Sequence, residues 1–210
     1  MMKRLPLTPL MMCGALLSGC VPESDNTAEK PAEILAKATG DPSDCLLLVW
    51  SNQKQRQPEF DRDHDFVEGG AISCATGTSA SQFDAAIATL REAAKSGNKA
   101  RLLQEVGLPL LYIDADGNRR EIEDRQEVEA VFDEIFDPSM IEVLQELDLS
   151  RMRVAKDQGG YFELGAIWLV VDRDGGRPRL MTVNRQALDE ALETARDQAD
   201  RNHGQPVPFD

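Results

Sequence analysis

Histidine and aromatic residues are scarce in this chain, and their scarcity limits the chemistry that it can perform. Only two histidines occur in 210 residues, and aromatic residues make up 5% of the sequence. No histidine lies between residues 65 and 202, so a Ser-His-Asp triad cannot form within that stretch. The same stretch has no Cys-x-x-Cys pair, no glycine-rich phosphate loop and no metal-ligand spacing. We therefore expect no catalytic residues, no metal and no cofactor.

Positive charge is also in short supply. The chain has 23 lysines and arginines against 37 aspartates and glutamates, which gives a formal net charge of −14. A surface this acidic repels phosphate backbones and anionic lipid head groups, so nucleic acid is excluded as a partner. The acidic residues are expected to keep the protein soluble, and the alternative is that they meet a basic partner.

The first twenty residues carry a targeting pattern. Lys3 and Arg4 precede an apolar run from Leu5 to Leu17, and small residues follow, as in a cleaved signal peptide. The run is too short for a membrane-spanning helix, and it contains prolines at positions 6 and 9. Its end, Leu17-Ser-Gly-Cys20, resembles the lipobox of bacterial lipoproteins. Simple secretion is the alternative.

The lipobox resemblance implies cleavage before Cys20 and acylation of that residue. Residues 1–19 are then a signal peptide, and the lipid anchor on Cys20 holds the protein to the membrane. Val21 stands where an aspartate would mark inner-membrane retention, so the resemblance implies the outer membrane, facing the periplasm. Residues 20–44 are rich in proline and acids and poor in apolar side chains, which predicts a flexible tether.

Two cysteines remain after this processing. Cys13 leaves with the signal peptide and Cys20 is lipidated, so Cys45 and Cys74 form an even pair in an oxidising compartment. A disulfide is predicted, and two separate buried thiols are the alternative. The apolar run of residues 45–50 predicts a buried strand, with residues 71–75 as its partner across the disulfide.

An acidic cluster, Asp61-Arg-Asp-His-Asp65, lies between those two segments. A metal site is one interpretation of this cluster. A solvated loop is the better one, because a single histidine and flexible carboxylates do not make a closed coordination set.

Residues 45–202 are predicted to form one α+β domain, followed by a tail at 203–210. Ser79 and Gln82 form a capping-box pattern that starts a helix. Further expected elements are a short helix at 99–106, a hairpin of 108–113 with 119–122, helices after Asp124 and from Pro138, strands at 151–155, 161–171 and 179–184, and a final helix at 186–200. Half of the strand at 161–171 is apolar on both faces, so either the N-terminal strands or a second subunit must cover the second face. A homodimer through the sheet face is therefore one expectation.

The order helix, helix, hairpin, helix and strands resembles the NTF2-like α+β superfamily over about residues 80–185. The local segments that carry the resemblance are Val106-Gly-Leu-Pro-Leu110, Phe132-Asp-Glu-Ile-Phe136, Gly165-Ala-Ile-Trp168 and Thr182-Val-Asn184. It implies a curved antiparallel sheet wrapped around helices, with a cavity at the wide end. The candidate cavity residues are Tyr112, Phe132, Glu163 and Trp168.

That superfamily contains isomerases, dehydratases and epoxide hydrolases as well as pure binding modules, so fold alone does not decide function. Because catalytic residues are missing, we expect a non-catalytic binding module for an envelope protein or a small apolar ligand. One alternative is a cavity enzyme that uses Glu163 or Tyr112 as an acid–base group. Another is an acidic inhibitor or immunity-type protein that meets a basic target.

Overall fold

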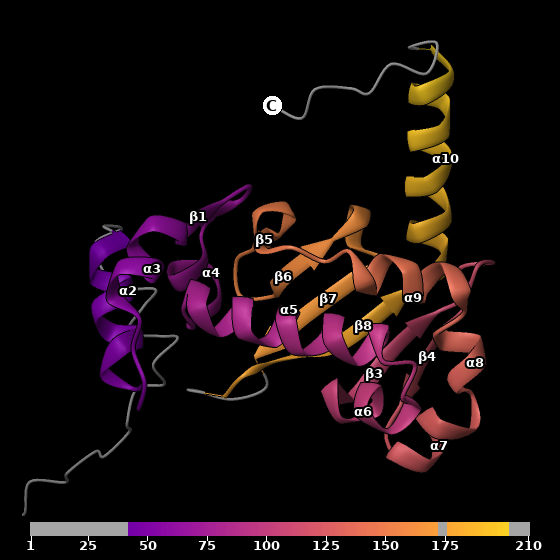
Figure 1. Cartoon of the computed structure of the whole chain (residues 1–210), viewed down its shortest axis with the longest axis horizontal. Helices are drawn as coiled ribbons and strands as arrows, with labels where there is room; N and C mark the ends of the chain where they lie inside the picture. Colours follow the sequence, from indigo (N-terminus) through magenta and orange to yellow (C-terminus); the bar gives the residue numbers. More distant parts are fainter. Residues whose placement is uncertain (1–41, 172–175, 202–210) are drawn as a thin grey trace, which may run out of the picture.

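The computed structural model describes residues 42–171 and 176–201. The expected signal peptide, Cys20, nearly all of the expected tether and the C-terminal tail lie outside these residues. The described part is a mixed α and β structure, with a six-stranded curved sheet and a group of helices packed on it (Figure 1).

The N-terminal part consists of short elements rather than the strand pair expected from the sequence. These are α2 (Pro42–Ser51), α3 (Pro58–His64), β1 (Phe66–Val67), β2 (Gly70–Ala71) and α4 (Ile72–Thr76). The expected strands at 45–50 and 71–75 are therefore wrong. Leu46, Val49 and Trp50 are buried while Leu47 is 62% exposed, which is the spacing of one helical face. A short apolar run cannot by itself distinguish a strand from a buried helix.

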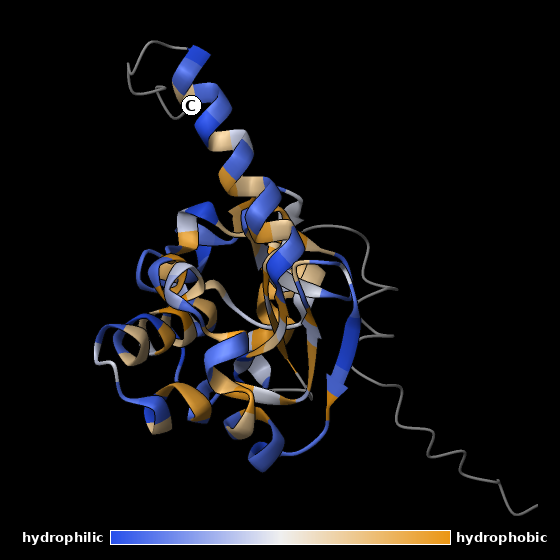
Figure 2. Cartoon of the chain, turned by 90° about the vertical axis from the view of Figure 1, so that its right-hand side faces the viewer, coloured by the Kyte–Doolittle hydropathy of each residue, from blue (hydrophilic) through white to orange (hydrophobic). Residues whose placement is uncertain are grey.

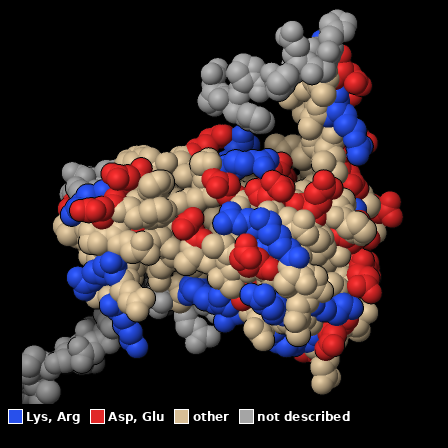
Figure 3. Space-filling view, in the orientation of Figure 1, with Lys and Arg blue, Asp and Glu red and all other residues tan. Residues whose placement is uncertain are grey.

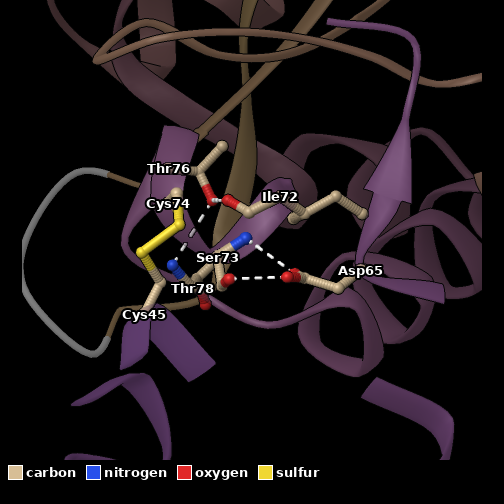
Figure 4. Close-up of a disulfide and its surroundings, with 7 residues drawn as sticks. All are labelled: Cys45, Asp65, Ile72, Ser73, Cys74, Thr76 and Thr78. Atoms are coloured by element: carbon tan, nitrogen blue, oxygen red, sulfur yellow. Dashed lines mark hydrogen bonds between the residues drawn. A yellow bond between two sulfur atoms is a disulfide. The ribbon is translucent and has the colours of Figure 1, made fainter. Parts of the chain in front are cut away.

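The predicted disulfide is confirmed, although it joins two helices instead of two strands. Cys45 of α2 bonds to Cys74 of α4, with 5.2 Å between their Cα atoms (Figure 4). The bond attaches α2 to the rest of the fold.

Helix α5 (Ala80–Lys95) is the long helix that crosses the sheet, and it starts after Ser79 as predicted. Its buried face includes Phe83, Ile87 and Leu90, and these side chains belong to the main hydrophobic core. The helices that follow pack beside it: α6 (Lys99–Glu105), α7 (Arg125–Ala130), α8 (Phe132–Ile135) and α9 (Pro138–Gln145).

The sheet has the strand order β4-β3-β8-β7-β6-β5. The expected hairpin is present as β3 (Val106–Ile113) and β4 (Arg119–Ile122). The other strands are β5 (Arg153–Ala155), β6 (Gly159–Phe162), β7 (Ile167–Val171) and β8 (Pro178–Asn184), and the one-turn helix η1 (Leu149–Arg151) precedes β5. The sheet was expected to be antiparallel, but this is wrong for one pair of strands: β8 lies beside β3 in the parallel direction.

The long strand predicted at 161–171 is two strands. The tight turn η2 (Glu163–Gly165) reverses the chain between β6 and β7. Glu163 and Leu164 adopt φ values of 46° and 55° there. The alternation expected of a single strand therefore breaks at Leu164, which is 54% exposed, whereas Phe162, two residues earlier, is buried.

The final helix, α10 (Arg185–Arg201), projects from the body (Figure 1). Only Ala187 and Leu188 of its side chains are fully buried. An ion pair between Arg185 and Asp137, the residue that caps α9, fixes the start of the helix to the body. The C-terminal half of α10 thus has little contact with the rest of the described chain.

Candidate functional site

Helices cover one face of the sheet, and no described helix lies over the other (Figure 2). One row of cross-strand neighbours runs over that open face through all six strands. It consists of Arg153, Tyr161, Trp168, Thr182, Leu111 and Glu121. We call these six residues the central row.

The rows on either side of the central row point the opposite way. On one side, Phe162, Ile167, Val183 and Tyr112 are paired across four strands and all are buried in the core. Because side chains alternate between the two faces of a strand, the central row faces away from the helices. All six of its members are at least partly exposed.

Two stacked aromatic rings occupy one half of the central row. The ring centroids of Tyr161 and Trp168 are 4.7 Å apart, with 25° between the ring planes. The indole Nε1 of Trp168 donates a hydrogen bond of 3.1 Å to the carbonyl oxygen of Gly165. Both rings are therefore held in place before anything binds, which lowers the entropic cost of binding.

Charges of opposite sign mark the two ends of the central row. At one end, Arg153 Nε lies 2.8 Å from Oε2 of Glu68, which extends from the loop between β1 and β2. At the other end, Glu121 of the edge strand β4 is exposed. Within the described ranges, Glu121 takes part in no ion pair. Acidic and basic side chains are interspersed on the opposite, helix-covered face of the molecule, which Figure 3 shows.

The candidate cavity residues Tyr112 and Phe132 are buried on the helix-covered side of the sheet. The Tyr112 hydroxyl donates to the backbone carbonyl of Glu134 at 3.3 Å, and the guanidinium of Arg120 lies over its ring. Burial, followed by the negative charge of Glu134, raises the pKa of Tyr112 above its usual 10.0, so the phenol stays protonated at neutral pH. Phe132 packs in the core with the Lys99 ammonium 4.5 Å from its ring centroid.

The other two candidates, Glu163 and Trp168, lie elsewhere. Glu163 is in the η2 turn and forms an ion pair with Arg151. Trp168 faces the open side of the sheet, opposite to Tyr112. The structure therefore does not bring the four residues into one cavity, and Glu163 and Tyr112 do not form an acid–base pair.

The acidic cluster is part of a helix, not the solvated loop expected from the sequence. Asp61 and Asp65 are almost completely buried, while Asp63 between them is exposed. Asp61 accepts hydrogen bonds from Trp50 Nε1 (2.7 Å) and from the backbone N–H of Ser81 (2.8 Å). It therefore caps the start of α5, a role that the sequence assigned to Ser79.

Asp65 plays the same part for α4. Its two carboxylate oxygens accept hydrogen bonds from the backbone N–H of Ser73 (2.8 Å) and from the Ser73 hydroxyl (2.7 Å) (Figure 4). Sequence reasoning missed both roles. The sequence does contain a signal for a helix here. Pro58 is typical of the first turn of a helix, and Asp61 and Asp65 are four residues apart, which places them on the same helix face.

A shallow apolar hollow lies at the end of α6, lined by Leu103, Val106, Leu108, Arg125 and Val128. It has no room to enclose a water molecule, and no candidate site residue lines it. Within the part of the chain that the structure describes, no three His, Cys, Asp or Glu side chains gather as metal ligands. None of the described helices combines the length and apolar character needed to cross a membrane.

Comparison with protein-family models, with curated proteins and with solved structures gives no match to this chain.

Proposed function

We propose that this protein is a lipid-anchored lipoprotein of the bacterial envelope that acts as a non-catalytic binding module. Its docking surface is the open face of the sheet, and its partner is a protein. The observation that carries the proposal is the stacked Tyr161–Trp168 pair, which is partly exposed on a sheet face that no described helix covers. Aromatic anchors held rigidly in an apolar patch are typical centres of protein interfaces.

The surroundings of the aromatic pair favour a protein over a small ligand. Thr182 and Leu111 continue the surface across β8 and β3, and Val170 lies two residues after Trp168 on β7. The shallow hollow described above lies elsewhere, at the end of α6, whereas small ligands are usually bound in concave pockets. An apolar centre with charged residues at its margins matches the general composition of protein interfaces.

The NTF2-like assignment is part of the same proposal. It is supported by the element order on which the resemblance rests: α5 and α6, the β3–β4 hairpin, helices α7 to α9, and then the remaining strands. The cleavage and acylation of Cys20, and the outer-membrane location, rest on the sequence pattern of residues 1–21.

Site-directed photo-crosslinking in intact cells tests the docking surface. A photoreactive residue at Thr182 lies in the middle of the central row, and one at Arg101, an exposed residue of α6, is the matched control. We expect position 182 to give discrete protein adducts on irradiation and position 101 to give none. If position 182 gives no more adducts than position 101, the open face is not a docking surface.

A further inference from the structure

The open face of the sheet does not share the acidic character of the chain. Side chains alternate between the two faces of a strand, so the residues on the open face are those that alternate with the buried core residues. Within the described strands, the charged members of this set are Arg119, Arg153, Arg179 and Glu121. Three cations and one anion thus occupy one face of a chain that has 23 basic and 37 acidic residues.

We propose that the protein partner of the open face docks through an acidic surface. The inference rests on the proposed function, because it names the chemistry of the occupant of the same docking surface. Carboxylates are the best partners of arginine, since the planar guanidinium can bind a carboxylate through two parallel hydrogen bonds. A basic partner surface is disfavoured, because it would place like charges against each other in the interface.

Arg179 lies near the aromatic pair and is held in place before a partner binds. It is the cross-strand neighbour of Val170, which lies two residues after Trp168 on β7. Its Nη1 donates a hydrogen bond of 2.9 Å to the backbone carbonyl of Gln104, at the end of α6. Within the described part of the chain, this bond leaves Nε and Nη2 of Arg179 for a carboxylate of the partner.

The three arginines lie at three different margins of the open face. Arg119 is exposed on the edge strand β4, and it forms no ion pair with another described residue. Arg153 lies on the opposite edge strand, β5. Its bond to Glu68 uses Nε, which leaves the two Nη groups for a second carboxylate. Arg179 lies at the start of β8, so the cations surround the aromatic centre as a charged rim.

The net charge of −14 opposes the approach of an acidic partner. The screening length is about 8 Å at physiological salt, so acidic residues on the other faces of the molecule have little influence at the contact. An arginine and a carboxylate in direct contact are much closer than this length and are screened far less. We therefore expect the charges on the open face, and not the net charge, to determine which partner surface is accepted.

Two charge variants in one strand test this inference. The photoreactive residue at Thr182 reports docking in intact cells, as the yield of protein adduct per molecule of the chain. We expect Arg119→Glu to lower this yield by about threefold or more, because it places a like charge against the acidic partner. Glu121→Arg should raise the yield, since it removes the one acidic residue of the set. Arg101→Glu on α6 is the matched control, because it changes the net charge as much as Arg119→Glu does, and it should leave the yield unchanged.

The opposite signs of the two effects separate docking from folding. Arg119 and Glu121 share a strand and a face, so a disturbance of β4 would lower the yield in both variants. A second readout is the partner segment joined to position 182, identified by mass spectrometry, which should contain more acidic than basic residues.

Four outcomes overturn the inference and leave the proposed function intact. These are equal yields in all variants, a yield lowered in both β4 variants, a partner segment that is not acidic, and a second copy joined through its own open face. The absence of protein adducts at position 182 in the natural chain overturns the proposed function itself.

Discussion

Two buried carboxylates, Asp61 and Asp65, connect the N-terminal helices to the body of the protein. Asp61 joins three elements at once, because it lies on α3, accepts from Trp50 of α2 and caps α5 through Ser81. Asp65 follows α3 and caps α4, which also carries Cys74. The residues of the acidic cluster are thus divided between helix caps and exposed side chains.

Replacement of Asp61 by alanine should destabilise the fold strongly. The indole N–H of Trp50 and the N–H of Ser81 would both lose their acceptor in a buried setting, at a cost of about 2–4 kcal/mol in the free energy of unfolding. Asp63→Ala is the matched control, because Asp63 belongs to the same helix and is exposed. Urea unfolding measures both variants, and equal losses would show that Asp61 does not act as a cap.

Asp65 should make stability depend on pH in an unusual direction. Burial raises the pKa of Asp65 above its ordinary value of 3.8, although the hydrogen bonds from Ser73 oppose that shift, and the charge of Asp61 adds to it. A raised pKa in the folded state means that the fold favours the protonated form. The contribution of Asp65 to stability is therefore fully present below about pH 3.9, the unfolded-state pKa, and is lost as the pH rises through the folded-state value.

The Asp65→Asn variant isolates this effect, because it carries no titratable group at position 65. We expect the unfolding free energy of the variant, relative to that of the natural chain, to increase as the pH is raised from 3 to 7. Urea unfolding at several pH values measures the difference between the two proteins. A constant difference over this range would mean that the pKa of Asp65 is the same in the folded and unfolded states.

At the scale of elements, the η2 turn determines which side chains reach the open face. It divides residues 161–171 into β6 and β7 and brings Tyr161 directly beside Trp168. The turn requires left-handed backbone at Glu163 and Leu164, a conformation that side chains with a Cβ adopt at a cost of about 1–2 kcal/mol each. Periodicity did not reveal this turn, because Phe162, Leu164 and Ala166 keep the two-residue alternation of apolar side chains through it.

Leu164→Asn should stabilise the protein. Asparagine tolerates the left-handed conformation better than leucine does, and Leu164 is largely exposed, so little packing is lost. We expect a gain of about 0.5–1 kcal/mol in the free energy of unfolding. Leu47→Asn on helix α2 is the control, since Leu47 is also largely exposed but helical, and it should be neutral or destabilising. A loss of stability in Leu164→Asn would mean that the turn is not strained there.

At the scale of the whole molecule, the proposed function assigns membrane attachment and partner binding to different parts of the chain. The acidic charge of the protein disfavours direct adsorption to anionic lipid. On the proposed function, attachment comes instead from the acyl chains on Cys20. The open face of the sheet is then left for the proposed partner.

Cys20→Ala should therefore abolish membrane association. We expect the natural chain to stay with the membrane fraction in washes of high salt and to be released by detergent, because hydrophobic anchoring does not depend on charge. Cys13→Ala is the matched control, since Cys13 lies within the segment that the proposed cleavage removes, and it should fractionate like the natural chain. Membrane association of the Cys20→Ala variant would refute acylation of Cys20 as the anchor.

Sequence alone determined the features that depend on local pattern. The starts of α5 and α9, the β3–β4 hairpin and the final helix were predictable because caps, turns and amphipathic periods are local properties. The Cys45–Cys74 pairing followed from counting cysteines. Only the tertiary structure decided that the apolar run at 45–50 is a helix, that Asp61 and Asp65 are buried caps, and that Tyr161 and Trp168 meet on an open face. The first two depend on contacts between residues distant in the chain, which local pattern does not encode, and the third depends on a left-handed turn that the apolar alternation conceals.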